Sequence, residues 1–553
     1  MPPASPARRT VVTGTLATGL AAATPLTLAA APAGAQTTTS FRHGVASGDP
    51  LPDAVVLWTR VTPSPDATPG SGRGADVRVD WEVASDPDFR RVVRRGRIVT
   101  GPDRDHTVKV DATGLQPATS YWYRFRSAGV LSQVGRTRTA PAPTASPRQL
   151  RIGVVSCSNW EAGYFAAYRH LADTPDLDLV LHVGDYLYEY PAGEYGTRGV
   201  AVRATEPAHE IVALADYRVR HGQYKADPDL QRLHAAVPWV TTWDDHESAN
   251  DAWSAGAENH DPETEGGWAA RAAAARQAYD EWMPIRLSGT AEVGDGHQLY
   301  RSLAFGRLAD LRLLDLRSYR SEQVGYDELG RVGDRARTIT GRAQMEWFKD
   351  SLATSDATWK LVGNPVMISP VNFLAVDAEI GQVLHDMTGI LPPDGIPYNP
   401  DQWDGYTAER REVIDFLGDR GITNTVFLTG DIHSAWACEL PDNAGLYPLS
   451  RSVGVELVAT SVTSDNLDDI LRVMPRTLST VAEAAIIANN RHIRYLDFDR
   501  HGYSVLTLTP GKAHMDWYVL TDKTSRTSTA RWSVGWSTTA GTHRLHREWG
   551  PSA

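Results

Sequence analysis

The sequence has 553 residues and carries 55 Lys and Arg against 67 Asp and Glu, which gives a formal net charge of −12 at pH 7. This acidic balance excludes a general nucleic-acid binder, because such proteins need a net or clustered positive field to displace counterions from phosphates. With 42% hydrophobic and 22% charged residues, the chain can bury large cores and is not a disordered polymer. The only two cysteines, Cys157 and Cys438, allow at most one disulfide.

The first 35 residues have the features of an export signal. They contain no acidic residue, and the pair Arg8 and Arg9 precedes an Ala- and Leu-rich run that ends in small residues at Ala35. This order is typical of a signal peptide, and the paired arginines before a weakly apolar run indicate the twin-arginine type. We therefore expect export through the twin-arginine machinery to the extracellular space. No later segment is long and apolar enough to span a membrane, and we expect a monomer.

Residues 36–139 are predicted to form a small all-β sandwich. Short runs of alternating polarity recur between turn signals, as in antiparallel strands. These runs are Ala54–Val61, Val77–Val83, Val92–Val99, Thr107–Val110 and Tyr121–Phe125. The stretch from Gly114 to Phe125 resembles the turn and strand of a fibronectin type III-like domain. Residues 140–147 are rich in Pro, Ala and Ser and are predicted to be a linker.

Residues 148–553 are predicted to form a layered α/β domain, because unbroken apolar runs alternate with segments of helical spacing. The predicted strands are Ile152–Val155, Leu177–Val183, Val237–Trp243, Leu308–Leu314, Leu361–Val362, Val426–Leu428 and Val455–Ala459. The predicted helices are Tyr164–Leu171, Trp268–Trp282, Gln344–Ala353 and Arg410–Leu417.

Side chains that can ligate a metal follow five of these strands. The segments are Ser156–Ser158, Gly184–Tyr188, Asp244–Glu247, Gly363–Asn364 and Gly430–His433. Ligands bind at the carboxyl edge of open α/β sheets, and a thiolate, carboxylates, an imidazole, a phenol and an amide that converge there form a metal site. Each motif alone is weak, since a Gly-Asp pair is more often a turn and a buried Cys is usually a packing residue. The prediction of a metal site therefore depends on the order of the five motifs along the chain.

That order resembles the metallophosphoesterase family. Gly184-Asp185-x-x-Tyr188 matches the first motif of its purple acid phosphatase branch. Asp245 stands where the second motif has Asn, and Asp431 stands where the third has His. Both replacements introduce carboxylates facing the second metal, and oxygen-rich sites suit hard cations such as Ca²⁺ rather than Zn²⁺.

This order of motifs, together with the carboxylates Asp245 and Asp431, is similar to the alkaline phosphatase D (PhoD-like) branch of this family. Further segments that carry the resemblance include Phe41–Pro50, Val56–Arg60, Leu314–Arg320 and Arg491–Asp497. The resemblance implies a calcineurin-like β-sandwich flanked by helices and preceded by a fibronectin III-like domain. It also implies one Fe³⁺ and one or two Ca²⁺ ions as cofactors.

The resemblance also implies roles for individual residues. The Fe³⁺ ligands would be Cys157, Asp185, Tyr188 and His433. Asp185 would bridge to a Ca²⁺ site, whose further ligands would be Asp245, Asn364 and Asp431. A ferric ion lowers the pKa of bound water, and the metals together neutralise phosphate oxygens during in-line displacement. His246, beside a predicted ligand, is the predicted general acid.

Three residues after the strand Leu308–Leu314 are weaker candidates. Arg317, Tyr319 and Arg320 could bind the substrate phosphate, because Arg offers paired donors. Ion pairs with acids such as Asp315 or Glu322 are an equal alternative. A disulfide between the two cysteines would fit an exported protein, but it would consume the predicted thiolate ligand.

The sequence therefore predicts a secreted metal-dependent alkaline phosphatase that hydrolyses phosphate monoesters, with phosphodiesterase activity, by attack of a metal-activated hydroxide on phosphorus. The first alternative is a phospholipase D-type phosphodiesterase that acts on phosphatidylcholine-like lipids. The segment Asp465–Asn490 could supply its apolar rim, although such a stripe is more often core packing. A non-catalytic wall-binding protein is the second alternative, against which the intact ligand set argues. No Gly-x-Ser-x-Gly elbow supports a serine hydrolase.

Overall fold

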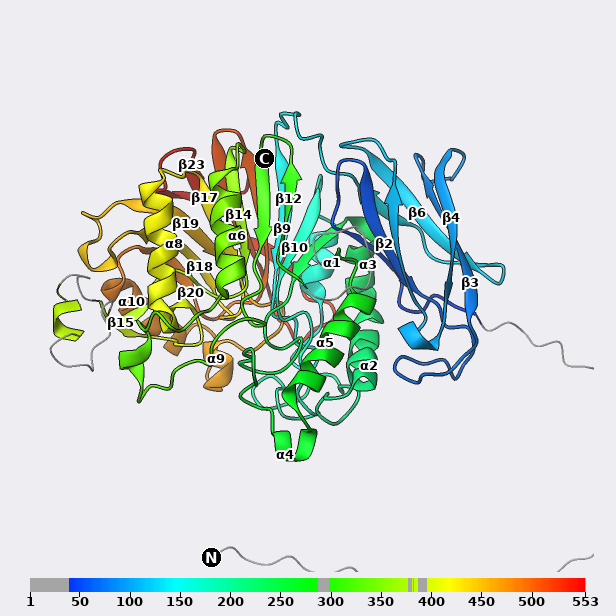
Figure 1. Ribbon diagram of the computed structural model, residues 1–553, viewed down its shortest axis with the longest axis horizontal. Helices are drawn as coiled ribbons and strands as arrows, with labels where there is room; N and C mark the ends of the chain where they lie inside the picture. The colour runs from blue at the N-terminus through cyan, green and yellow to red at the C-terminus, as the bar shows by residue number, and fades with distance from the viewer. Residues whose placement is uncertain (1–38, 287–297, 376–379, 381, 386–394, 553) are drawn as a thin grey trace, which may run out of the picture. The chain divides into compact units, whose positions relative to one another are not determined.

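The computed structural model describes residues 39–286, 298–375, 380, 382–385 and 395–552 (Figure 1). The predicted export signal, residues 1–35, lies outside this range. Thr38–Ala553 forms one compact unit. Among the described residues, none of the helices combines the length and apolar character needed to cross a membrane.

Two large sheets form the centre of this unit. The first, in spatial order, contains β24 (Leu545–Glu548), β23 (Ala530–Thr539), β22 (Lys512–Leu520), β21 (Gly502–Thr509), β9 (Leu150–Val155), β10 (Leu179–Val183), β11 (Trp239–Thr242), β1 (Val45–Gly48), β2 (Ala54–Arg60) and β5 (Thr107–Thr113). The second contains β12 (Arg301–Phe305), β13 (Ala309–Leu313), β14 (Trp359–Asn364), β17 (Thr425–Thr429), β19 (Ser452–Val458), β18 (Ala435–Pro441) and β20 (Ile493–Asp497). Their apolar side chains meet in one buried cluster, to which Leu181 and Leu361 contribute from opposite sheets.

Parallel strands lie at the middle of each sheet. β9, β10 and β11 run parallel, with Leu179 paired to Ile152 and Val180 to Trp239. β13, β14, β17 and β19 are likewise parallel. Because the carboxyl ends of parallel strands meet at one edge of a sheet, the segments that follow these strands gather on the same side.

Helices cover the outer faces of both sheets (Figure 1). The first sheet packs against α1 (Ala166–Ala172), α2 (Leu214–Lys225), α3 (Pro228–Ala236) and α5 (Trp268–Trp282). The second packs against α6 (Arg342–Ala353) and α8 (Thr407–Asp419). This arrangement of helices, sheet, sheet and helices confirms the predicted layered α/β class. α5 has the predicted bounds.

The remaining elements are short or peripheral. They are α4 (Pro262–Glu265), α9 (Leu467–Ile470), α10 (Leu478–Asn489), β15 (Asn372–Ala375), β16 (Gly395–Pro397) and 3-10 turns at Pro102–Arg104, Leu329–Arg331, Trp403–Gly405 and Ala444–Leu446.

The N-terminal region contains a separate five-stranded sheet. It is built from β4 (Val92–Thr100), β3 (Val77–Ala84), β6 (Ser120–Ser127), β7 (Val130–Leu131) and β8 (Gly135–Arg138). This sheet packs on β2 and β5 through a core that includes Val79 and Tyr123. The opposite layer of the sandwich continues into the first large sheet, because β1 pairs with β11 where Gly48 meets Trp239. A Cβ at Gly48 would lie 2.1 Å from the Pro284 carbonyl oxygen, so this junction needs glycine. The domain boundaries at 139 and 148 stay predictions.

Candidate metal centre

The structure brings together the ligand-type residues that follow the parallel strands. Among the residues that the structure describes, three groups hold at least three carboxylate, imidazole or thiol ligand atoms that lie within 4.8 Å of one another. The groups are Cys157, Asp185 and His433; Asp185, Asp245 and His246; and Asp244, Asp245 and Asp431. Since Asp185 and Asp245 each belong to two groups, the three form one continuous cluster.

The four predicted iron ligands lie side by side. Tyr188 donates a hydrogen bond of 3.0 Å from Oη to Asp185 Oδ2, and its Oη lies 3.2 Å from His433 Nε2. Cys157 is fully buried, and both cysteines are free, so no disulfide consumes its sulfur. Asp185 Oδ1 is buried and lacks a hydrogen-bond partner among the described residues. An unpartnered carboxylate oxygen beside a thiol, a phenol and an imidazole fits a metal ion.

The backbone is strained at these positions. Four site residues have the positive φ of the left-handed region: Cys157 at 58°, Asp185 at 56°, Asp431 at 63° and His433 at 52°. This conformation costs a non-glycine residue about 1–2 kcal/mol, and such residues concentrate at functional sites. Before Asp185, Gly184 has φ of 114°, and a Cβ there would lie 2.5 Å from Asp244 Cβ. Glycine thus lets the turns after β10 and β11 approach closely.

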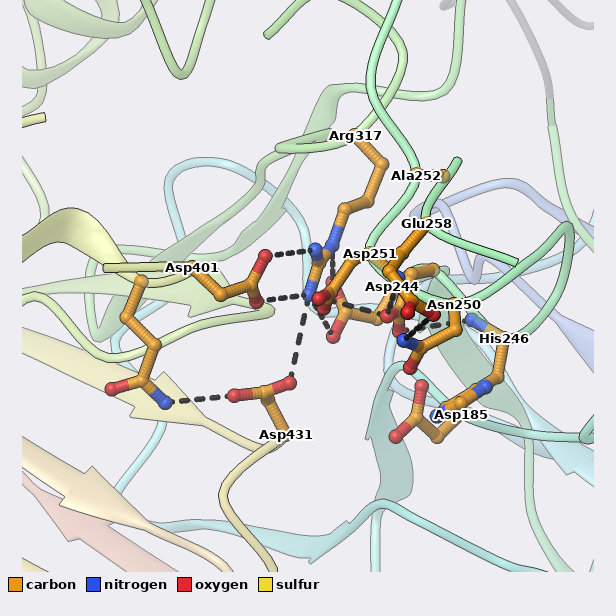
Figure 2. Close-up of polar contacts among 12 residues, drawn as sticks. Asp185, Asp244, His246, Asn250, Asp251, Ala252, Glu258, Arg317, Asp401 and Asp431 are labelled. Carbon is orange, nitrogen blue, oxygen red and sulfur yellow. Dashed lines mark hydrogen bonds and ion pairs between the residues drawn. The ribbon is translucent and has the colours of Figure 1, made fainter. Parts of the chain in front are cut away.

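Arg317 lies inside the carboxylate-rich part of the cluster (Figure 2). Its Nε donates to Asp244 Oδ1 at 2.6 Å and its Nη1 to Asp401 Oδ1 at 2.8 Å. Its Nη2 lies 3.8 Å from Asp245 Oδ2 and 3.5 Å from Asp431 Oδ1. One buried guanidinium therefore faces four carboxylates, which leaves an excess of negative charge.

Burial and neighbouring charges shift the pKa values of the carboxylates in and beside this cluster. Burial, together with the Asp401 charge, raises the pKa of Asp431 to about 7. Burial raises the pKa of Glu247 to about 7 as well. At Asp245 burial acts in the same direction, but the charges of Arg317 and His246 outweigh it and lower the pKa. A bound cation would stabilise the charged form of these carboxylates, which burial and neighbouring negative charges disfavour.

Asn364, at the end of β14, is held by its own hydrogen bonds. Its Nδ2 donates to the Val366 carbonyl at 2.6 Å and to Thr429 Oγ1 at 3.2 Å, while its Oδ1 accepts from Trp403 Nε1 at 3.2 Å. A carbonyl oxygen has two lone pairs, so one is left for a cation. Its role as a Ca²⁺ ligand stays a prediction.

His246 has a carboxylate partner that the sequence interpretation missed. Its Nδ1 lies 2.8 Å from Glu189 Oε2, and its ring packs against Tyr188 at a tilt of 31°, with centroids 4.2 Å apart. Burial opposes protonation of His246, but the charges of Asp245 and Glu189 outweigh it and raise the pKa of the imidazole. Glu189 is itself fully buried and accepts from the Asn250 N–H at 2.6 Å. The available signal was its place directly after the Gly184–Tyr188 motif.

Arg320 and Tyr319 contact protein groups around the cluster. Arg320 is fully buried, pairs with Asp401 at 2.7 Å and donates to the Ala252 carbonyl at 2.8 Å. The half-buried Tyr319 lies against Tyr300, with ring centroids 5.9 Å apart. The arginines thus pair with acids other than the two suggested by sequence proximity. Substrate contact by Arg317, Tyr319 and Arg320 stays a prediction.

Two further groups support the cluster from distant parts of the chain. Gln402 donates from Nε2 to Asp431 Oδ2 at 2.7 Å. The buried Lys523 pairs with Asp465 Oδ1 at 2.6 Å, and the Asp465 carbonyl lies 2.8 Å from His433 Nδ1. This contact leaves Nε2 of His433 facing the cluster. Neither Gln402 nor Lys523 stands in a recognisable motif, so the sequence offered no signal for them.

Comparisons with known proteins agree with this geometry. The family described as PhoD-like phosphatase matches residues 152–517, and the PhoD-like phosphatase N-terminal domain matches residues 27–141. Alkaline phosphatase D from Bacillus subtilis (strain 168) is 39% identical over 487 residues, which cover 87% of this chain and 77% of that protein. A solved structure described as PhoD superposes with a TM-score of 0.80 at 36% identity, covering 93% of this chain and 92% of that one. The chain therefore belongs to the PhoD-like phosphatase family and is a phosphoric ester hydrolase.

Proposed function

We propose that this protein is a secreted, metal-dependent alkaline phosphatase that hydrolyses phosphate monoesters and also has phosphodiesterase activity. The main support is the buried cluster in which a thiol, a phenol and an imidazole share Asp185 with a group of carboxylates. That combination offers a mixed sulfur, nitrogen and oxygen site next to an oxygen-rich one. Two adjacent cations suit an in-line displacement at phosphorus.

The donor sets suggest which ion each site would hold. Cys157, Asp185, Tyr188 and His433 would hold Fe³⁺. The remaining ligands, Asp245, Asn364 and Asp431, would hold Ca²⁺ with Asp185 as the bridge, and a second Ca²⁺ stays unassigned. The unpartnered Oδ1 of Asp185 supports this bridging role. When bound, the metals would polarise the phosphate oxygens and activate a water molecule as the nucleophile.

His246 would donate the proton to the leaving oxygen. Its Nδ1 contacts Glu189, which orients the ring and leaves Nε2 for the substrate. The charges of Asp245 and Glu189 favour the protonated imidazole that this role requires. The tilted ring contact with Tyr188 restricts the imidazole next to the proposed iron site. Glu189 is thus a positioning residue, and His246 is the catalytic one.

Export would depend on the first 35 residues. The paired arginines, the apolar run and the small residues at Ala35 support recognition by the twin-arginine machinery and removal of the segment. The same features support an extracellular location. We further propose that the mature protein is a monomer.

An apolar surface near the cluster favours a phospholipid phosphodiesterase as the second candidate function. Ile470 is 62% exposed, Met474 is 74% exposed and Val481 is 67% exposed. The acidic side chains of the same segment, Asp468 and Glu483, are buried. The segment that carries these residues begins at Asp465, whose carbonyl lies 2.8 Å from His433 Nδ1, so the start of the segment contacts the proposed iron site. An exposed apolar patch beside a catalytic site suits a lipid substrate.

Relative rates on three substrates separate these functions. The mature, metal-loaded protein is assayed with p-nitrophenyl phosphate, bis(p-nitrophenyl) phosphate and phosphatidylcholine vesicles. The proposal predicts turnover of the monoester and slower turnover of the diester. A protein that is inert on all three would overturn it.

Substitutions at the apolar surface test the second candidate. The double change Ile470→Ser and Met474→Ser should lower vesicle hydrolysis at least about 10-fold if lipid is the substrate, because apolar contact with the bilayer is lost. Activity on p-nitrophenyl phosphate should persist. Val99→Ser is the matched control, since Val99 is 62% exposed on the distant strand β4. Equal effects of the control and the double variant would exclude the lipid function.

A further inference from the structure

The N-terminal region differs in charge from the rest of the chain. Residues 39–139 contain 15 Arg and Lys against 11 Asp and Glu, whereas the whole sequence has a net charge of −12. The excess is concentrated in β3, β4 and β6, where Arg recurs at alternate positions of β4 and β6. These strands form the outer sheet at one end of the compact unit, on the right of Figure 1. A net positive sheet in an acidic protein calls for a functional account.

The cross-strand register arranges these charges in two rows. Glu82 on β3 lies between Arg95 on β4 and Arg124 on β6. In the next row of the same face, Asp80 lies between Arg97 and Arg126. The intervening residues, such as Val79, Val83 and Phe125, are buried in the sandwich core, so the charged ones face outward.

The two rows line a hollow on the outer face. Its volume is about 400 Å³, and its charged lining residues are Asp80, Glu82, Arg95, Arg97, Arg124 and Arg126. Neighbouring strands are about 4.8 Å apart, so the arginines of β4 and β6 stand roughly 10 Å apart across β3. Four guanidinium groups therefore surround two carboxylates in one concave surface.

Half of these guanidinium groups remain unneutralised. Arg97 pairs with Asp80 at 2.7 Å, and Arg124 pairs with Glu82 at 2.8 Å. Arg95 and Arg126 are exposed, and within the part of the chain that the structure describes their side chains form no hydrogen bond or ion pair. Because the Arg97 pair is exposed, its arginine can turn to an incoming anion at little cost.

The chemistry of the hollow selects a phosphate-bearing ligand. Guanidinium groups bind phosphate through paired hydrogen bonds. A single-stranded nucleic acid would in addition need exposed aromatic rings for base stacking. Phe125, which lines the hollow, is buried in the sandwich core, and Trp81 packs against that core. The nearby Phe89 ring is already covered by Arg124, whose Cζ lies 3.9 Å from the ring centroid. A polymer without bases, bearing phosphates at short intervals, matches the charge and leaves no requirement for stacking.

We propose that the outer face of β4, β3 and β6 is an accessory binding surface for a linear, base-free phosphate polymer. Arg95 and Arg126 would bind its phosphates, one from each edge strand. The site is separate from the metal cluster and does not depend on the catalytic proposal. The surface binds the polymer through a few exposed ionic contacts, so the affinity for the polymer should fall as the salt concentration rises. The affinity should increase with polymer length, because a longer polymer offers more phosphates to the same surface.

Binding of inorganic polyphosphate to the full mature protein tests this surface. The double variant Arg95→Glu and Arg126→Glu should bind at least about 10-fold more weakly at 0.1 M salt, because two attractive contacts become repulsive. Asp80→Asn should bind about 3-fold more tightly, because it removes an acid from the hollow and releases Arg97. Activity on p-nitrophenyl phosphate should stay unchanged in both variants.

The control carries the same change in net charge elsewhere. Arg342, with a side chain 91% exposed on α6, and Arg531, exposed on β23, are both changed to Glu. This control should retain wild-type affinity for polyphosphate. Equal losses in the two double variants would attribute binding to overall charge and overturn the proposal.

Binding measurements with polyphosphate and with other anionic polymers complete the test. Failure of the wild-type protein to bind polyphosphate would overturn the proposal even if its phosphatase activity is normal. Equal binding of polyglutamate would contradict a phosphate-specific surface, and tighter binding of single-stranded DNA with the same number of phosphates would contradict the base-free ligand. Preference for polyphosphate, together with the opposite effects of the Arg and Asp80 variants, would support it.

Discussion

The metal-ligand cluster has an excess of negative charge, and the outer N-terminal sheet has an excess of positive charge. The charges of the cluster are buried, whereas those of the sheet are exposed. In the cluster Asp244 is fully buried and Arg317 is 2% exposed, so their charges need fixed partners. On the sheet, the side chains of Arg97 and Asp80 are 59% and 38% exposed. Water and salt screen the second pair far more than the first. A substitution in the cluster should therefore change chemistry or stability strongly, whereas one on the sheet should act mainly on binding.

The largest effect is expected at Asp185. Asp185→Asn should lower phosphatase activity by about 10³-fold or more, because it removes the shared carboxylate of the two proposed metal sites. Iron and calcium content, measured by mass spectrometry, should fall with the activity. In metal-free protein the same change should raise the free energy of unfolding by about 1–2 kcal/mol, because burial disfavours the charged carboxylate and raises the pKa of Asp185.

Asp404→Asn is the matched control for this prediction. Asp404 is equally buried, but it pairs with Arg410 and accepts from the Val371 N–H at 3.0 Å. Its replacement should lower stability by about 3 kcal/mol and leave the metal content intact. If both variants lost stability and kept their metals, Asp185 would be a structural residue.

A smaller loss is expected when the partner of His246 is changed. Glu189→Gln should lower kcat by about 10²-fold, because the amide orients the imidazole less firmly and does not favour its protonation. The metal content should be unchanged, and the alkaline limb of the pH–rate profile, where His246 loses its proton, should move to lower pH because the Glu189 charge no longer raises the pKa of the imidazole. Glu161→Gln, at a buried glutamate that accepts from the Gly193 N–H, should leave kcat and the profile as in wild type. An unaltered profile in Glu189→Gln would remove Glu189 from the mechanism.

Buried and exposed histidines should differ in their effect on acid stability. Burial lowers the pKa of His492 from 6.5 to about 4, so the unfolded chain binds a proton there more readily than the folded one. The resulting stability is present above pH 6.5 and is lost as the pH falls toward 4. Between pH 6.5 and 5, proton binding to His492 in the unfolded chain should lower the free energy of unfolding by roughly 1.5 kcal/mol. His492→Gln should abolish this contribution, and urea unfolding at the two pH values measures it. His546→Gln, at an exposed position of β24, should leave the pH dependence unchanged; equal behaviour of the two variants would contradict this account.

The smallest effect on stability is expected on the charged sheet. Asp80→Asn should change the free energy of unfolding by less than about 0.5 kcal/mol, because its pair with Arg97 is exposed. The difference should shrink further in 0.5 M salt. Urea unfolding at two salt concentrations measures it. A loss above 2 kcal/mol would show that this pair holds the sheet together and does not simply line a binding surface.

The sequence predicted the cluster better than its surroundings, for a physical reason. Each predicted metal ligand ends a buried strand or lies in the short segment that follows one, so strand order and parallel pairing were enough to bring Cys157, Asp185 and Asp431 into one cluster. Asp401 and Lys523 come from loops whose positions depend on tertiary packing, and no local pattern marks them. The pairing of β1 with β11 was likewise hidden, because no strand was predicted at Val45–Gly48 and these residues lie within the range assigned to the N-terminal sandwich.

Metal content measured together with activity tests the central claim most directly. The mature protein is purified, its iron and calcium are quantified, and its phosphatase rate is followed as a chelator removes the metals and as they are restored. The proposed function predicts one iron and one or two calcium ions per chain, with activity that falls and returns with them. Full activity in a protein free of bound metal would contradict it.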